Sequence, residues 1–353
     1  MNNKAKYLLM GNAESPHLIK WARELAKHVD LYVLSFQETD KAIYQLIEKE
    51  KCYSFHQKIN TAGGNFHLLK LLPKVKRIIK EIKPDFINAH YITSYGFLAA
   101  LVKPGYSKLI LSAWGSDILV TPFESNLKKK ITQYALKKSF LVTSDSNFMS
   151  EKIRVLSPKA HILTFPFGLE KMPECSIENK NPTLFFSNRA LTPNYRIELV
   201  LELFSEICTT MPESRLIIAN EGSEKEKLMK IAAELGISNN IEWVGFINAE
   251  RQAEIYKKAT YFFSVPISDA TSVSLLEAMA YGCVPIVSDI PANHEWIKHL
   301  ENGIFIQNNT NIIEYLKNTN HSHVFDLNRK IIKERAIFSE NILGFIKSLF
   351  VIV

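Results

Sequence analysis

The chain has 353 residues, of which 46% are hydrophobic and 22% charged. This length and composition are typical of a soluble globular protein with two domains. No window reaches the roughly 18 consecutive apolar residues that a membrane-spanning helix needs, and the N-terminus has no signal-peptide pattern. The four cysteines lack metal-ligand spacing, which is typical of free thiols in a reducing compartment. We therefore expect a cytoplasmic protein.

The net charge of +7 is unevenly distributed along the chain. Residues 1–170 have 25 basic and 14 acidic side chains, whereas residues 171–353 have 18 and 22. This asymmetry indicates that the first half meets an anionic partner, although a solvated surface without a partner gives the same pattern.

Short β-rich runs alternate with amphipathic segments through a predicted first domain, 1–171. Its predicted strands are Lys6–Met10, Leu31–Phe36, Phe86–Ala89, Lys108–Ala113, Phe140–Thr143 and Ile162–Phe165. Its predicted helices are Leu18–His28, Phe66–Ile82, Tyr95–Leu101, Leu127–Lys138 and Asn147–Val155. The polar segment 172–182, which holds two prolines, predicts a linker.

The alternation restarts in a predicted second domain, 183–330. Its predicted strands are Thr183–Ser187, Arg215–Ala219, Ile241–Val244, Tyr261–Val265, Val284–Ser288 and Gly303–Ile306. Its predicted helices are Ile197–Thr209, Glu224–Leu235, Glu250–Lys258 and Ser272–Tyr281, and 331–353 predicts a C-terminal helix that packs toward the first domain. The pattern predicts an α/β fold of two Rossmann-like domains, with a ligand site in the cleft between them, at the carboxyl ends of the strands.

The loop and helix after the predicted strand Tyr261–Val265 have the features of an anion site. Thr271 or Ser272 is suited to cap the helix, and the first N–H groups and the dipole of a helix attract an anion such as a diphosphate. Glu277 is an acid in an otherwise apolar helix, where ribose hydroxyls would pair with it. Asp269, in the loop, is placed to reach past such a diphosphate to a group attached to it. Alternatively, Asp269 forms a turn and Glu277 lies on the helix surface.

The segment Ser268–Asp289, SDATSVSLLEAMAYGCVPIVSD, resembles the E-x7-E signature of family 4 retaining glycosyltransferases of the GT-B fold, with Asp269 in place of the first Glu. Pro166–Glu170, Asn220–Leu228 and Val244–Pro266 resemble other segments of that family. The resemblance implies that the second domain holds the nucleotide and the first holds the acceptor.

The resemblance also implies roles for single residues. Arg189, and Arg196 near the position of an expected lysine beside Tyr195, hold the donor phosphates, although either could be a surface cation. Glu277 binds ribose hydroxyls, while Asp269 contacts the sugar and stabilises positive charge at its anomeric carbon. The remaining implied donor-binding residues are Ser272, Val273, Ser274, Gly245 and Phe246. No Asp-x-Asp, G-x-G-x-x-G or P-loop motif occurs, so we expect no metal and no cofactor.

The first domain offers candidates for the acceptor side. Trp114 stands where the family commonly has a histidine, and it either stacks on a sugar or is structural. Asp117 either lies at the cleft or caps a turn, and His90, at a strand end, either touches substrate near the reacting centre or packs in the core. Gly11 and His17 follow the first strand and are placed to approach the acceptor.

Two basic runs in the first domain are interleaved with apolar residues at helical spacing. They are Lys70, Lys74, Lys76, Arg77, Lys80 and Lys83, and Lys128, Lys129, Lys130, Lys137 and Lys138. Such helices rest on anionic membrane surfaces, which here would be the inner leaflet, although a charge run is also typical of a solvated face.

The resemblance implies a hexosyltransferase that moves a sugar from a nucleotide-sugar to a glycan or polyprenyl-diphosphate-linked acceptor with retention of anomeric configuration. Bacterial surface polysaccharide synthesis, including lipopolysaccharide, is the expected setting. Two alternatives stay open, namely a sugar-nucleotide epimerase of the same fold and a basic module that binds nucleic acid. The chain has no recognisable nucleic-acid-binding motif, so we expect no nucleic-acid partner.

Overall fold

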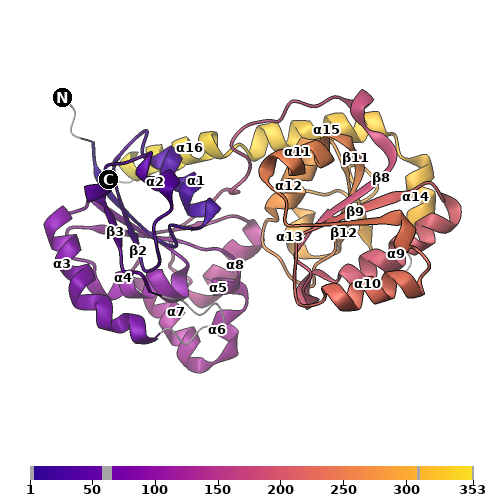
Figure 1. The fold of residues 1–353 in the computed structure, drawn as a ribbon. Coiled ribbons are helices and arrows are strands. Elements are labelled where there is room, and N and C mark those ends of the chain that lie inside the picture. Colours follow the sequence, from indigo (N-terminus) through magenta and orange to yellow (C-terminus); the bar gives the residue numbers. More distant parts are fainter. Residues whose placement is uncertain (1–3, 58–65, 308–310, 352–353) are drawn as a thin grey trace. The chain divides into compact units, whose positions relative to one another are not determined.

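The chain forms two compact units, and a computed structural model describes residues 4–57, 66–307 and 311–351. Unit 1 comprises Met1–Phe165 and Ser339–Val353, and unit 2 comprises Pro166–Phe338. Each unit is an α/β structure built on one parallel sheet (Figure 1).

Unit 1 contains a seven-stranded sheet in the order β3-β2-β1-β4-β5-β6-β7, in which all neighbours are parallel. Its strands are β1 (Lys6–Met10), β2 (Asp30–Ser35), β3 (Cys52–Ser54), β4 (Phe86–His90), β5 (Lys108–Ser112), β6 (Leu141–Ser144) and β7 (Ile162–Thr164). The edge strand β3 was not predicted, because three half-buried residues give too short a pattern to recognise.

Helices cover both faces of the unit 1 sheet (Figure 1). They are α1 (Pro16–Leu25), α2 (Lys41–Tyr44), α3 (Leu72–Ile82), α4 (Phe97–Val102), α5 (Ser116–Leu119), α6 (Thr121–Glu124), α7 (Asn126–Lys138), α8 (Asn147–Leu156) and α16 (Phe338–Val351). Side chains from α3, α4, α7 and α8 pack in one core with the sheet. Trp21 of α1 and Phe345 of α16 pack against each other with ring centroids 5.7 Å apart.

Unit 2 contains a six-stranded parallel sheet in the order β10-β9-β8-β11-β12-β13. Its strands are β8 (Asn181–Asn188), β9 (Arg215–Ala219), β10 (Ile241–Gly245), β11 (Ala259–Ser264), β12 (Val284–Ser288) and β13 (Ile304–Ile306). Its helices are α9 (Ile197–Thr210), α10 (Lys225–Glu234), α11 (Ala249–Lys258), α12 (Val273–Ala280), α13 (Pro291–His294), α14 (Ile312–Asn318) and α15 (His321–Arg335). Side chains from α9, α10 and α14 pack in one core, and side chains from α11, α12 and α15 pack in another.

The predicted C-terminal helix, 331–353, is in fact two helices, α15 and α16. Between them, the Ala336 carbonyl accepts a hydrogen bond from the Leu169 amide at 2.8 Å, and the Phe338 amide donates to the Leu169 carbonyl at 2.7 Å. This exchange joins the segment around Leu169 to the end of α15 within unit 2, which begins at Pro166. Residues 352 and 353 lie outside the described residues.

Each sheet has one point where the strand order reverses, between β1 and β4 in unit 1 and between β8 and β11 in unit 2. Loops at the carboxyl ends of the two strands diverge there, which is where open parallel sheets bind ligands. Gly11 follows β1 and His90 ends β4, whereas Arg189 follows β8 and the loop with Asp269 follows β11. These four predicted site residues therefore lie at the two points, whereas Trp114 and Asp117 follow β5, and Gly245 and Phe246 lie at the end of β10.

Candidate active site

Helix α12 begins and ends at residues that its sequence predicts. The Ser272 hydroxyl caps its first turn by accepting a hydrogen bond from the Leu275 amide at 3.3 Å. At the other end, Gly282 has φ +74°, and the amides of Gly282 and Cys283 bond to carbonyls of the last turn. A Cβ at Gly282 would lie 2.1 Å from the Phe325 ring. The N–H groups of Val273 and Ser274 in the first turn have no intrahelical acceptor, which suits an anion.

Arg189 is the centre of the candidate site in unit 2. It is buried, and its guanidinium donates to the Ser272 hydroxyl, to the Ser274 hydroxyl at 2.7 Å and to Asp269 Oδ2 at 2.5 Å. Its carbon Cζ lies 4.3 Å from the centroid of the Tyr195 ring. The Nε atom has no hydrogen-bond partner within the described residues. A buried cation at a helix start with an unused donor fits an anionic ligand.

Asp269 is the only carboxylate that pairs with Arg189 among the ion pairs of the described chain. Its second oxygen, Oδ1, accepts a hydrogen bond from the Ala270 amide at 3.0 Å. Burial raises the pKa of Asp269, and the Arg189 charge opposes this shift without reversing it. The structure thus brings Asp269 together with Arg189, Ser272 and Ser274.

Glu277 contacts protein groups at the position where ribose hydroxyls were expected. Its Oε2 accepts a hydrogen bond from the Gln252 amide at 2.7 Å and a longer one from the Tyr256 hydroxyl at 3.5 Å. Gln252 and Tyr256 belong to α11 and had not been singled out. The Tyr256 hydroxyl also donates to the Ser274 carbonyl at 3.0 Å, so α11 supports the first turns of α12.

Arg196 does not join the cluster around Arg189. Its Nε donates to the Val265 carbonyl at 2.8 Å and its Nη2 to the Pro266 carbonyl at 3.4 Å. The backbone of Arg196 is left-handed, with φ 45°, directly before α9. In this structure Arg196 therefore holds the loop after β11, and its predicted phosphate contact would need these bonds to be exchanged.

Asn194 is a loop anchor that the sequence did not indicate. Its carbonyl accepts from the Ile267 amide at 2.7 Å, and its side-chain amide donates to the Ser268 carbonyl at 3.1 Å. These bonds join the loop after β11, which carries Asp269, to the segment after β8, which carries Asn194.

Gly245 and Phe246 lie at the end of β10, at the far edge of the unit 2 sheet. Gly245 has φ +64°, and a Cβ there would lie 2.9 Å from the Glu221 carboxylate. Phe246 is largely exposed. The glycine is thus required by backbone conformation, and a nucleotide contact at Phe246 stays a prediction.

In unit 1, aromatic rings gather around His90. Its ring lies 4.8 Å from Trp21 and 5.4 Å from Trp114, and the His17 ring lies 5.1 Å from Trp114. Gly11 packs tightly beside them, since a Cβ there would lie 2.6 Å from Leu18 and 3.3 Å from His90. The structure therefore brings together four of the residues predicted on the acceptor side.

A buried polar row orients His90. Asn88 donates through Nδ2 to the Ser112 hydroxyl at 2.9 Å, so its Oδ1 faces Tyr7 and His90 and accepts from both. His90 therefore carries its proton on Nε2, and its Nδ1 has no partner among the described residues. Burial lowers the pKa of His90 to about 3, so the ring is neutral. Asn88 and Ser112 read as strand residues in the sequence and gave no signal of this role.

Asp117 was predicted as an acceptor-binding residue or a turn cap, and the structure favours the cap. Its side chain is fully buried. Oδ1 accepts from the Trp114 amide at 2.9 Å and Oδ2 from the Ile92 amide at 2.7 Å. In this structure both oxygens join the turns after β4 and β5, and a contact of Asp117 with an acceptor stays a prediction.

The pH dependence of stability should report on Asp117. Burial raises its pKa to about 6, above the value of about 3.9 in an unfolded chain. The folded state therefore retains a proton that the unfolded state releases, and this group lowers the free energy of unfolding by about 3 kcal/mol as the pH rises from about 4 to 6. In urea titrations, the stability advantage of the wild type over Asp117→Asn should shrink across that range. An advantage that is constant from pH 4 to 7 would contradict this assignment.

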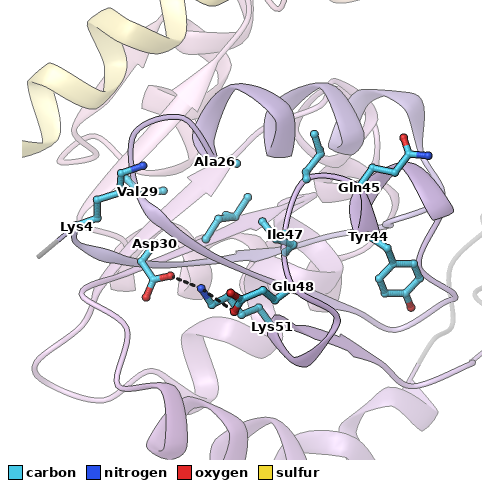
Figure 2. Close-up of a pocket in the computed structure, with 11 residues that line it drawn as sticks. Lys4, Ala26, Val29, Asp30, Tyr44, Gln45, Ile47, Glu48 and Lys51 are labelled. Atoms are coloured by element: carbon cyan, nitrogen blue, oxygen red, sulfur yellow. Dashed lines mark ion pairs between the residues drawn. The ribbon is translucent and has the colours of Figure 1, made fainter.

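A cavity of about 670 Å³ lies elsewhere in unit 1 (Figure 2). It is lined by residues before or at the start of β1, β2 and β3, including Lys4, Asp30 and Lys51. The Lys51 ammonium contacts Asp30 at 3.0 Å and Glu48 at 3.3 Å on its wall. Since these are the amino ends of the strands, the cavity is remote from His90 and Trp114 and forms no part of the candidate site.

Family models match both units. Residues 6–146 match the model described as "Glycosyl transferase 4-like", and residues 170–334 match "Glycosyl transferases group 1". The chain belongs to the glycosyltransferases. Its fold is GT-B, as in the structure of Anabaena Alr3699/HepE in complex with UDP and glucose, which has a TM-score of 0.79 at 16% identity and covers 98% of this chain and 99% of that one. The predicted fold and enzyme class are confirmed.

Two sequence relatives of this glycosyltransferase have a lipid in their names. The GDP-mannose:cellobiosyl-diphosphopolyprenol alpha-mannosyltransferase of Xanthomonas campestris is 24% identical over 68% of this chain and 65% of its own length. The alpha-monoglucosyldiacylglycerol synthase of Acholeplasma laidlawii is 26% identical over 71% of this chain and 70% of its own length. The matches span 33%, 64% and 65% of the length of three of the curated relatives.

Two kinds of prediction about this glycosyltransferase stay predictions. One is the role of each single residue in binding or catalysis. The other is the absence of a metal requirement, although no group of three or more His, Cys, Asp and Glu side chains in the described parts of the chain is arranged to hold a metal ion.

Proposed function

We propose that this glycosyltransferase moves a hexose-type sugar from a nucleotide-sugar to a lipid-linked or glycan acceptor, with retention of anomeric configuration, in the synthesis of a bacterial surface polysaccharide or glycolipid. The observation that carries the proposal is the buried Arg189 at the start of α12, with an unused Nε donor. Such a site suits the diphosphate of a donor, because a guanidinium and helix N–H groups bind phosphate oxygens strongly.

The reaction follows from where charge develops. As the bond between the anomeric carbon and the diphosphate breaks, negative charge grows on the leaving oxygens, and Arg189 and the start of α12 stabilise it. Asp269 then faces the positive charge on the sugar, and Glu277 holds the ribose by exchanging its bonds to Gln252 and Tyr256. The acceptor hydroxyl attacks the anomeric carbon from the side that the diphosphate leaves, and its proton passes to the departing phosphate.

We assign the acceptor side to unit 1. His90 has a neutral, unprotonated Nδ1 without a partner among the described residues, and because this atom is buried, a sugar hydroxyl reaches it only after neighbouring side chains move. The half-buried Trp114 ring, with the His17 ring inclined to it by 59°, supplies an aromatic surface of the kind that sugars contact.

A thermal-shift screen tests the donor assignment. A donor that binds only the folded state raises the unfolding temperature, so one of the UDP-, GDP-, dTDP- and ADP-sugars should do so at a concentration well above its dissociation constant. If none of these sugars shifts the transition or is hydrolysed, the proposed function is wrong.

The proposal includes contact with a membrane surface, but through other side chains than the first basic run predicted from the sequence. The apolar residues within the first basic run, Val75, Ile78, Ile79 and Ile82, are buried in the core. By contrast, Phe123 of α6 and Leu127 of α7 are 56% and 58% exposed, next to exposed Lys129 and Lys130. No helix in the described parts of the chain is long and apolar enough to cross a membrane. We therefore place the contact on α6 and α7, where apolar and basic side chains adjoin.

Replacing both Phe123 and Leu127 by serine should lower binding to vesicles of anionic lipid at least tenfold, because burying each apolar side chain is worth about 1.5–3 kcal/mol. Vesicle flotation measures this. The matched control is Val155→Ser on α8, which removes an apolar side chain that is 71% exposed in the same unit. Equal flotation of the double variant and the wild type would exclude this surface.

A further inference from the structure

The free protein satisfies Arg189 with one of its own carboxylates. The guanidinium Nη2 lies 2.5 Å from Asp269 Oδ2, and the side chains of Arg189 and Asp269 are only 9% and 20% exposed. The Nη1 atom is taken by the hydroxyls of Ser272 and Ser274. Most of the phosphate-binding capacity of Arg189 is therefore already in use before any donor arrives.

A phosphate and the Asp269 carboxylate compete for this guanidinium. The carboxylate is planar and the phosphate is tetrahedral, but each presents two oxygens that accept hydrogen bonds from the same N–H groups. Two such negative charges on one partly buried guanidinium repel each other more strongly than they would in water. A diphosphate consequently binds well to Arg189 only if the carboxylate leaves Nη2 or loses its charge.

The local structure allows the side chain to move without the loop. Asn194 holds the backbone on the strand side of Asp269, at Ile267 and Ser268, and the cap of α12 holds the other side, at Ser272. A rotation about the two side-chain torsions of an aspartate is enough to leave Nη2, and staggered alternatives for these torsions exist in most backbone conformations.

We propose that Asp269 is an exchangeable internal ligand of Arg189, which the donor diphosphate displaces and which returns to expel the nucleoside diphosphate after transfer. This inference rests on the proposed function. In the donor complex the released carboxylate faces the sugar, where its negative charge stabilises the positive charge that develops at the anomeric carbon. Once the sugar has left, Arg189 is the only charged partner of this carboxylate among the described residues, so the carboxylate lowers the affinity for the remaining nucleoside diphosphate.

The test is the binding of UDP and GDP, without sugar, to the wild type and to Asp269→Asn. The asparagine keeps the size of the side chain and removes the charge. The better-binding nucleoside diphosphate should bind the variant about tenfold more tightly, which equals about 1.4 kcal/mol, while sugar transfer falls at least 100-fold. Glu202→Gln, which removes the charge of an exposed acid on α9, should change neither value. Asp269→Ser also removes the charge and should give the same result, so that a folding defect in only one variant does not decide the test.

The outcomes separate this inference from the donor site itself. If Arg189→Ala weakens nucleoside diphosphate binding but both Asp269 variants bind it no more tightly than the wild type, the exchange is refuted and the donor site stands. If Arg189→Ala leaves binding unchanged, the donor site is refuted as well.

Discussion

Replacing Arg189 by alanine should lower the rate of sugar transfer by at least about 1,000-fold, since removing a single donor that stabilises a developing anion costs about 100- to 1,000-fold and Arg189 supplies several. Arg189→Lys should restore only a small part of the rate. An ammonium on a flexible chain has no planar fork to contact Asp269 and the two hydroxyls of Ser272 and Ser274 together.

Two further variants make the Arg189 result interpretable. Removing the arginine leaves the Asp269 carboxylate partly buried without its partner, which destabilises the fold. The double variant Arg189→Ala/Asp269→Asn should regain stability without regaining transfer. Arg215→Ala, which removes an exposed arginine of β9 in the same unit, is the matched control. Initial rates at saturating and limiting donor measure the effect, and near-wild-type turnover in a folded Arg189→Ala protein would contradict the assignment.

Replacing Glu277 by alanine should weaken donor binding by about 100-fold, because two hydrogen bonds from hydroxyls to a carboxylate are worth about 1.5–3 kcal/mol each. The fold should survive, since the Tyr256 hydroxyl keeps its bond to the Ser274 carbonyl and the helix keeps its cap. Asp269→Ala should instead lower turnover at saturating donor more than it weakens donor binding.

Glu277→Gln sharpens this prediction. It keeps the volume of the side chain but places an amide against the amide of Gln252, which now donates to Glu277 at 2.7 Å. Glu254→Gln, at an exposed acid of the neighbouring α11, is the control. Isothermal titration with the donor identified in the screen gives the affinities. Unchanged affinity in both Glu277 variants would mean that the carboxylate only supports α11 and α12.

The fold was largely predictable because its central strands are buried and apolar. Runs such as Tyr7–Met10 and Phe262–Ser264 have no polar face, which is typical of a parallel sheet covered on both sides. Most elements that were not predicted are short or lie at an edge, such as β3, α2 and α13, but α15 (His321–Arg335) is long and was predicted only from residue 331 onward. The residue at which α15 ends was not predicted either. The backbone pairing next to that end joins Leu169 to Ala336, which is distant in the sequence.

The candidate site was predictable where its signals are local. Ser272 at the helix start and Gly282 beyond its end have their predicted places because capping depends on neighbouring residues. The pairing of Arg189 with Asp269 could not be read from the sequence, since parallel strands bring together loops that are 80 positions apart. Likewise, the contact of Gln252 with Glu277 depends on tertiary structure, and so does the bond from Asp117 to the distant Ile92 amide, although a turn cap was one of the two roles predicted for Asp117. The predicted phosphate contact of Arg196 overlooked the loop carbonyls that it binds.

A crystal structure of the protein with the nucleoside diphosphate of its donor tests the central claim most directly. The account predicts phosphate oxygens within hydrogen-bond distance of the Arg189 guanidinium and of the first-turn N–H groups of α12, with the Asp269 carboxylate released from Nη2 and the ribose on Glu277. A nucleotide bound elsewhere, with Arg189 still paired to Asp269, would contradict it.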